Sequence, residues 1–252
     1  MALNRQLISA LYGKYEGKPI LVIGGGPSAA ADLERIPVDY PACVISANGH
    51  GYKQNRFRTD YIVNVDYTYN VGRILMERYL AQFSCPKINR WSWADYRLPE
   101  WKFAGDSGFT AVVTANMLGG WPVLVTGLDR FSPGRKYFWE TADPAKPYKG
   151  TSWRPPHLQN QLDGLKKALP GACVRPLSGP LTSVFPAWGG VESELPPYTP
   201  AEARRPAATG FRVQAQRKCY LHPADPIQPG VIMPMTPGEA ERLLFTSAVK
   251  KL

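Results

Sequence analysis

The stretch Lys18-Pro-Ile-Leu-Val-Ile-Gly-Gly-Gly-Pro-Ser28 decides the expected fold of this chain. Its apolar run, residues 20–23, is short, rich in β-branched residues and closed by glycines, which predicts a buried strand. The glycines permit a tight turn and let a ligand approach the backbone closely. Pro27 and Ser28 are typical of the first turn and cap of a helix, which we expect to run toward Arg35. Such a junction predicts an anion site, because the free N–H groups and the helix dipole point the same way.

Composition limits the class of protein. The chain has 252 residues, 44% hydrophobic and 20% charged, which is typical of a globular protein able to bury a core. No segment approaches the length of a membrane-spanning helix and the N-terminus lacks the apolar core of a signal peptide, so we expect a cytoplasmic protein with no membrane span. The four cysteines are scattered, which argues against a zinc site or a disulfide framework. The net charge of +10 favours an anionic partner or substrate, or simply reflects solvated lysines.

Strand and helix patterns alternate along the chain. Short apolar runs predict strands at residues 20–23, 41–48, 59–66, 122–126 and 173–177. Helical spacing predicts helices at 3–12, 28–35, 71–79, 105–120 and 158–169. We interpret 87–103 as irregular and 130–156 as a long basic and aromatic loop. The alternation predicts an α/β, Rossmann-like fold, in which a mostly parallel sheet carries helices on both faces.

Three parts follow from this pattern. Residues 1–185 are the expected Rossmann-like nucleotide(-sugar)-binding catalytic domain. Residues 186–209 are rich in proline and short of apolar periodicity, so we predict a linker. Residues 210–252 are the expected small C-terminal α+β module, with a Pro-Gly turn at 229–230 and a short helix after it.

Polar residues and glycines follow several predicted strands, where parallel sheets bind their ligands. Gly24-x-Gly26-x-x-Ala29 formally matches the dinucleotide fingerprint. That fingerprint expects an acidic residue after the second strand, and Asn48 stands there instead. An NAD enzyme is therefore disfavoured, and the remaining interpretations of the glycines are another nucleotide site or a turn with no ligand.

Several titratable residues are candidates for chemistry. His157 stands just before a predicted helix and is either a general base or a capping or surface residue. Asp66, Asp106 and Asp129 could bind a divalent metal together with phosphate oxygens. Equally, Asp106 could cap a helix and Asp129 could hold the turn after its strand. Tyr137, within a basic loop, suits phosphate recognition, and the alternative is a solvated loop.

The succession Gly24-Gly-Gly-Pro-Ser28, Ser46-Ala-Asn48, Asp106-Ser-Gly108, Val125-Thr-Gly-Leu-Asp129 and Lys136-Tyr-Phe138 resembles the small bacterial sialyltransferases with a single Rossmann-like nucleotide-sugar domain. The resemblance covers roughly residues 18–185. It implies a CMP- or UDP-type nucleotide-sugar donor, no further cofactor, Tyr137 stabilising the departing phosphate and His157 deprotonating the acceptor hydroxyl. The residues expected to bind substrate are Gly25, Gly26, Pro27, Ser28, Asn48, Asp66, Ser107, Gly108, Asp129, Arg135 and Lys136.

Two positions depart from that family. It uses a pair of tyrosines around the phosphate, where this chain has Phe131 at the first position, and its third strand tends to end in Asn rather than Asp66. The segment Asp60 to Asp66 is similar to a family that includes 6-hydroxymethylpterin pyrophosphokinases. This second resemblance implies Mg²⁺ bridging ATP phosphates, with Asp66 and Asp129 as ligands.

The C-terminal stretch 236–244 is similar to small modules in bacteriophage proteins. That similarity implies a phage-encoded protein that works in the host cytoplasm and modifies DNA or a glycan. The positive charge is compatible with a DNA acceptor. A non-catalytic phage accessory protein is the alternative outside enzymes.

Overall fold

A computed structural model of the chain describes residues 6–65, 77–89, 93–98, 106–129, 137–138 and 155–200. For residues 155–157 it describes the backbone alone. The described residues belong to two units, one containing 6–65 and 85–200 and the other containing 77–84.

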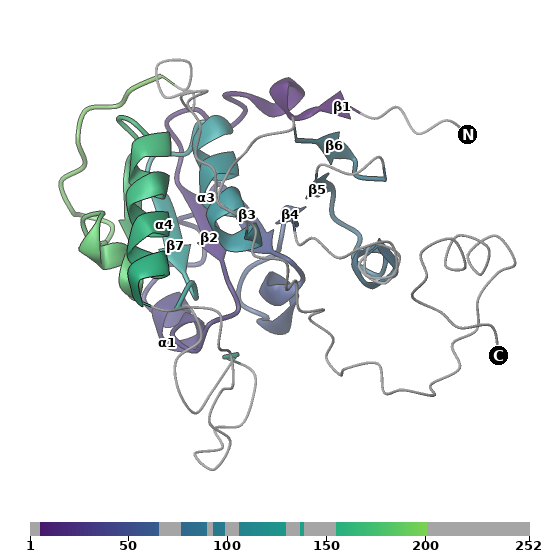
Figure 1. Cartoon of the computed structure of the whole chain (residues 1–252), viewed down its shortest axis with the longest axis horizontal. Coiled ribbons are helices and arrows are strands. Elements are labelled where there is room, and N and C mark those ends of the chain that lie inside the picture. Colours follow the sequence, from purple (N-terminus) through teal and green to yellow (C-terminus); the bar gives the residue numbers. More distant parts are fainter. Residues whose placement is uncertain are drawn as a thin grey trace, which may run out of the picture. The chain divides into compact units, whose positions relative to one another are not determined.

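An eight-stranded, entirely parallel sheet organises the first unit (Figure 1). Its strands are β1 (Gln6–Leu7), β2 (Ile20–Ile23), β3 (Cys43–Ala47), β4 (Tyr61–Val63), β5 (Lys87–Asn89), β6 (Tyr96–Arg97), β7 (Val123–Thr126) and β8 (Val174–Pro176). Their order is β1-β6-β5-β4-β3-β2-β7-β8. Strand β2 lies between β3 and β7, so the strand order reverses direction at the junction of β2 and β7. This junction is the topological switch point at which open parallel sheets bind ligands.

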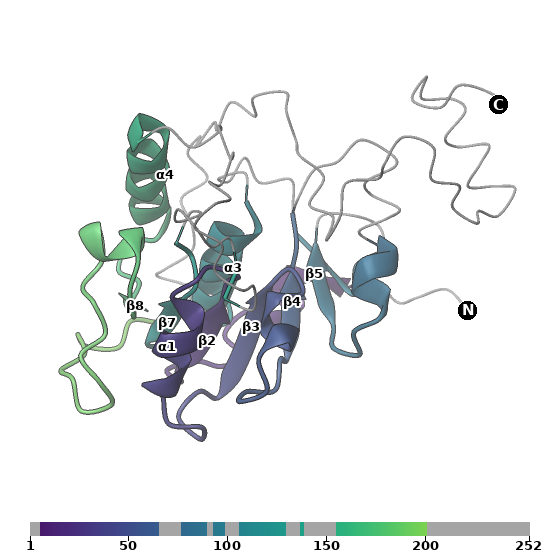
Figure 2. The same cartoon turned by 90° about the horizontal axis from the view of Figure 1, so that it is seen from below.

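Helices cover both faces of this sheet, which confirms the predicted α/β, Rossmann-like fold (Figure 2). The α-helices are α1 (Ala29–Glu34), α3 (Ser107–Met117) and α4 (Pro155–Ala168). Within the described ranges, three 3-10 helices accompany them, η1 (Ile8–Leu11), η2 (His50–Lys53) and η3 (Pro180–Ser183). In the larger core cluster, α3 and α4 pack on the face formed by Ile20, Val22 and Ile45. In the smaller cluster, α1 packs on the face formed by Leu21 and Ile23.

Burial on both faces explains the sequence patterns of the central elements. All four residues of β2 are buried, because each of its two faces lies beneath helices. In α3 every residue except Gly108 is buried, so this helix lacks the polar stripe of a surface helix. Helix α4 keeps such a stripe, with Leu162 and Leu165 buried and Lys166 exposed.

Two sequence predictions were wrong at the edge of the sheet. Residues 3–12 were expected to form a helix, yet Gln6–Leu7 is strand β1, which pairs with β6, and Ile8–Leu11 is a 3-10 helix. Residues 87–103 were expected to be irregular, yet they contain β5 and β6. These strands have two or three residues each, too few to produce a recognisable pattern.

The segment 186–200, the first part of the predicted linker, packs against the sheet domain. Trp188 is 4% exposed and belongs to the smaller core cluster, and its backbone N–H donates to the carbonyl of Pro176 at 2.9 Å. Further along, the indole N–H of Trp121 donates to the carbonyl of Pro196 at 3.1 Å. Residues 186–200 therefore belong to the domain. The rest of the predicted linker and the C-terminal module lie outside the described residues.

The described part of the second unit is short. Residues 77–81 are helical and overlap the helix predicted at 71–79, whose earlier residues lie outside the described ranges. Leu80 is buried, and the rings of Tyr79 and Phe83 meet edge to face with centroids 5.4 Å apart. Among the helices that the structure describes, none has the length and apolarity needed to cross a membrane.

Candidate functional site

The glycine loop after β2 is joined to the loop after β7. The N–H of Gly24 donates to the carbonyl of Thr126 at 2.9 Å, and the N–H of Gly26 donates to that of Gly127 at 2.7 Å. A Cβ on Gly24 would overlap the carbonyl of Gly127, and Gly127 itself has φ +66°. Glycine is therefore required at both positions, by close approach at one and by a left-handed backbone at the other. The two loops form a single rigid edge at the switch point.

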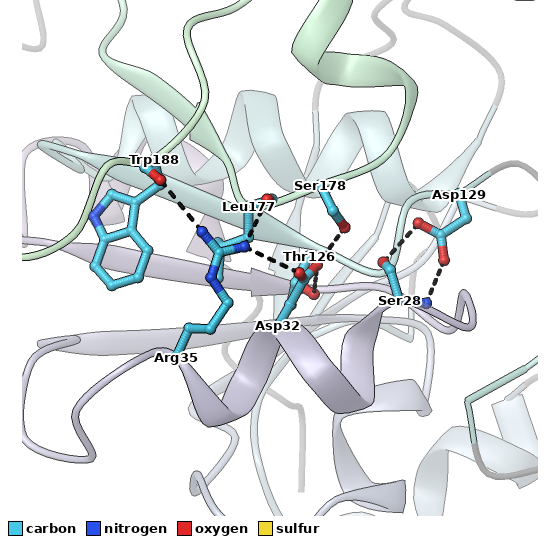
Figure 3. Close-up of polar contacts among 8 residues, drawn as sticks. All are labelled: Ser28, Asp32, Arg35, Thr126, Asp129, Leu177, Ser178 and Trp188. Carbon is cyan, nitrogen blue, oxygen red and sulfur yellow. Dashed lines mark hydrogen bonds and ion pairs between the residues drawn. The ribbon is translucent and has the colours of Figure 1, made fainter.

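Asp129 occupies the anion position that the sequence predicted for a ligand (Figure 3). One carboxylate oxygen accepts from the Ser28 N–H at 2.7 Å, and the other accepts from the Ser28 hydroxyl at 2.6 Å. Ser28 was expected to cap α1 or to bind the donor, but its side chain makes no cap hydrogen bond and contacts Asp129 instead. Gly26 packs directly against the same carboxylate, since a Cβ on Gly26 would overlap the carboxylate of Asp129. The N-terminus of α1 is thus occupied by a side chain of the protein itself, that of Asp129.

Tyr137 lies against the glycine loop although it is separated from it by more than one hundred residues. An added Cβ on Gly25 would be 2.9 Å from Cδ1 of Tyr137 and 2.9 Å from Cγ of His50. The N–H of Phe138 donates to the Gly25 carbonyl at 3.0 Å, which fixes this contact through the backbone. The rings of Tyr137 and His50 lie 5.2 Å apart, tilted by 33°. Gly25 and Tyr137, both predicted site residues, are therefore brought together, and His50 joins them.

The turn after β3 is stabilised from inside the domain. Asn48 has φ +56°, a left-handed conformation that asparagine tolerates better than most residues. The Ser46 hydroxyl donates to the Asn48 carbonyl at 2.7 Å and accepts from the Gly51 N–H at 2.6 Å. Ser46 is fully buried, while Asn48 and His50 are partly exposed. The turn thus presents Asn48 and His50 at the carboxyl edge of the sheet.

Three asparagines form a ladder of side-chain amides across β3, β4 and β5. Asn89 Nδ2 donates to Asn64 Oδ1 at 2.8 Å, and Asn64 Nδ2 donates to Asn48 Oδ1 at 2.5 Å. Asn64 and Asn89 are buried and Asn48 is partly exposed, so the ladder runs from the interior to the edge. Asn48 was predicted from the sequence as a site residue. Asn64 and Asn89 were missed, and their position at the ends of two strands was the signal that could have revealed them.

The start of α3 was expected to contact the donor through Ser107 and Gly108. Asp106 caps the helix, accepting from the Phe109 N–H at 2.7 Å, as one of its two interpretations predicted. Ser107 is buried and its hydroxyl accepts from the Val65 N–H at 3.0 Å. A Cβ on Gly108 would be 2.7 Å from a methyl carbon of Leu128. Asp106 therefore caps α3, while Ser107 and Gly108 contact the loops after β4 and β7.

The remaining predicted residues are described in part or not at all. Asp66, Arg135, Lys136 and the loop residue Phe131 lie outside the described residues. Pro27 is partly exposed in the glycine loop. His157 belongs to the first turn of α4, where the structure describes only the backbone. Because α4 connects the parallel neighbours β7 and β8, it returns the chain from their carboxyl edge, and its first turn starts on that side.

A buried carboxylate, Asp32 of α1, was not predicted at all (Figure 3). It accepts from the hydroxyls of Thr126 at 2.9 Å and Ser178 at 2.5 Å. The neighbouring Arg35 lies 3.5 Å from it and donates to the carbonyl of Leu177 at 2.9 Å. These contacts join α1 to the carboxyl ends of β7 and β8, and they give Asp32 a structural role.

The described residues also show whether the side chains could bind a metal ion and where pKa values are perturbed. Among the described residues, no group of three or more His, Cys, Asp or Glu side chains is arranged to hold a metal ion. Two residues with raised pKa values, Cys43 and Tyr15, lie at the amino edge of the sheet, opposite the candidate site. Burial raises the pKa of the Cys43 thiol to about 12 and raises the pKa of Tyr15 above its ordinary value.

Comparison of the chain with protein-family models, with curated proteins and with solved structures found no match.

Proposed function

We propose that this chain is a transferase that binds a nucleotide-sugar donor at the carboxyl edge of its parallel sheet and passes the sugar to a hydroxyl acceptor. The observation that carries the proposal is the contact of Tyr137 with the glycine loop, made through Gly25 and the Phe138 N–H. A phenol at the switch point suits a phosphate ester, which requires hydrogen-bond donors.

Each candidate residue has a role in this reaction. Asn48 lines the donor site, and Tyr137 donates to the phosphate as it departs. Arg135 and Lys136 balance its charge. His157 removes the proton of the acceptor hydroxyl, whose oxygen attacks the anomeric carbon. The bond between that carbon and the phosphate oxygen breaks, and the nucleotide leaves with the electron pair.

The contacts of Asp129 favour this reaction over the pyrophosphokinase alternative. Pyrophosphoryl transfer would require Mg²⁺, for which Asp66 and Asp129 were the candidate ligands. Both oxygens of Asp129 accept from Ser28, so the carboxylate would have to exchange these partners to hold a metal. The identity of the acceptor is a separate part of the proposal. The net charge of +10 favours an anionic acceptor, either DNA or an acidic glycan.

A thermal-shift screen tests the proposal. The ligands are CMP-, UDP- and GDP-sugars and ATP, each with and without Mg²⁺. We expect a CMP- or UDP-sugar to raise the Tm without Mg²⁺, because a ligand that binds only the native state stabilises it by mass action. A shift with ATP and Mg²⁺ alone would favour the pyrophosphokinase, and no shift with any nucleotide would favour a non-catalytic accessory protein.

The assigned base can be tested separately. His157→Ala should lower transfer about 10²–10⁴-fold, the usual contribution of a general base, while the donor still raises the Tm. Gln159→Ala, an exposed change in the same helix, is the control and should transfer normally. Unchanged turnover in His157→Ala would remove His157 from the mechanism.

A further inference from the structure

His50 is a titratable side chain at the candidate site that the proposed mechanism does not use. It lies in η2, directly after the turn that ends β3. Its ring faces Tyr137, with centroids 5.2 Å apart, and its Cγ and Nδ1 are 2.9 Å from the position of a Cβ on Gly25. Three parts of the chain therefore meet here: the glycine loop, the turn after β3 and the segment containing Tyr137.

The backbone holds His50 in this position through buried groups. On one side, the Ser46 hydroxyl bridges the Asn48 carbonyl and the Gly51 N–H. A Cβ on Gly51 would be 2.8 Å from Cβ of Ser46 and from Oγ1 of Thr59, so this residue packs closely against the sheet. Within the turn, the two glycines at 49 and 51 are buried while Asn48 and His50 are partly exposed. The imidazole is thus held at the edge on a rigid turn, a feature typical of ligand-binding groups.

The chemistry of the neighbours indicates what His50 would bind. An imidazole N–H and a phenol are both hydrogen-bond donors. Both rings pack against Gly25, where a Cβ would clash with them, and the imidazole is partly exposed at the edge of the sheet. Phosphate oxygens are strong acceptors that a charge-assisted donor recognises well. We infer that His50 binds a phosphate oxygen of the nucleotide beside Tyr137. This inference rests on the proposed function, since it concerns the same donor site.

A comparison of a nucleotide with its nucleoside tests the inference. The affinities of CMP and cytidine are measured by calorimetry for the wild type, His50→Gln and His50→Ala, after the fold of each variant is verified by thermal melting. We expect both variants to lose about tenfold or more in CMP affinity and to bind cytidine unchanged, since a hydrogen bond to a charged group has that magnitude. Lys53→Gln removes a cation from the same 3-10 helix at an exposed position and should bind CMP like the wild type.

Imidazole NMR provides a second readout. The chain has only three histidines, so the His50 resonances can be assigned by comparing the wild type with His50→Gln. CMP should shift these resonances and cytidine should leave them in place.

The possible results separate the inference from the proposed function. Equal losses for CMP and cytidine, or a loss for Lys53→Gln as large as for His50→Gln, would overturn the role of His50 and leave the transferase proposal standing. Selective loss of CMP affinity in a protein that transfers no sugar would uphold His50 and overturn the transferase. Absence of CMP binding to the wild type would move the comparison to UDP and uridine, and absence of both CMP and UDP binding would overturn both proposals.

Discussion

Asp129 illustrates how one carboxylate can connect two loops at the residue scale. Asp129→Ala would remove the acceptors of both the Ser28 N–H and the Ser28 hydroxyl. We expect the free energy of unfolding to fall by about 1–3 kcal/mol, the usual cost of leaving partly buried donors unsatisfied. Urea denaturation measures this loss, and Asp163→Ala on the exposed side of α4 should change stability by less than about 0.5 kcal/mol. Unchanged stability combined with lost nucleotide binding would show that Asp129 faces the ligand instead.

The pairing of Ser28 with Asp129 also marks a limit of sequence reasoning. Both residues could be predicted at the same edge, because each follows a parallel strand. Which donor meets which acceptor depends on loop geometry, and that geometry follows from the close approach of Gly24 to Gly127. The local sequence around Gly24 and Gly127 does not predict that the two residues approach each other. The Ser28 N–H, one of the donors expected to face a phosphate, therefore bonds a carboxylate of the protein.

At the scale of elements, the asparagine ladder joins three strands by their side chains. Asn64→Ala removes its middle member and leaves Asn48 Oδ1 and Asn89 Nδ2 without these partners. We expect a loss of about 1–3 kcal/mol in the free energy of unfolding, because the buried amide of Asn89 and the amide of Asn48 each lose one hydrogen-bond partner. Asn55→Ala, at an exposed loop position, is the control. A loss no greater than that of the control would mean that the ladder does not stabilise the sheet.

The amino edge of the same strands should make the protein sensitive to alkali. Burial raises the pKa of Cys43 to about 12 from its ordinary 9.0, so above pH 9 the thiol ionises in the unfolded chain before it ionises in the folded one. Its contribution to stability is therefore complete below pH 9 and is lost as the pH rises toward 12. We expect roughly 1.4 kcal/mol of loss per pH unit in this window. Urea denaturation at pH 8 and pH 10 measures it, and Cys43→Ala should flatten the decline.

Sequence reasoning succeeded for the central elements and failed for the outer ones, for a physical reason. Strands β2, β3 and β7 are buried on both faces and therefore consist mostly of apolar residues, with glycine or asparagine directly after each strand. Strands β1, β5 and β6 have two or three residues and begin or end in polar ones. Their pairing depends on the strands beside them, which the local pattern does not encode. The same limitation hid His50 and Asn64, whose partners come from distant parts of the chain.

At the scale of the whole domain, the segment after β8 shows that composition can mislead. Prolines and weak periodicity in residues 186–200 predicted a linker. One large side chain nevertheless holds the segment on the domain, because Trp188 covers the face of the sheet on which α1 packs. Arg35 of α1 lies beside it and donates to the Trp188 carbonyl at 3.5 Å. The sheet is therefore enclosed on this face by a helix and by an irregular segment together.

The contribution of residues 186–200 to the stability of the domain can be measured by truncating the side chain of Trp188. Trp188→Ala should lower the free energy of unfolding by about 3–5 kcal/mol, because it opens a cavity in the smaller core cluster, to which Leu21 and Val44 also belong. Val191→Ala, three residues further at a side chain 47% exposed, is the matched control and should cost little. Chemical denaturation compares the two variants. Equal, small losses would mean that residues 186–200 rest on the domain without stabilising it, as a linker would, whereas the expected difference makes them part of the folded unit.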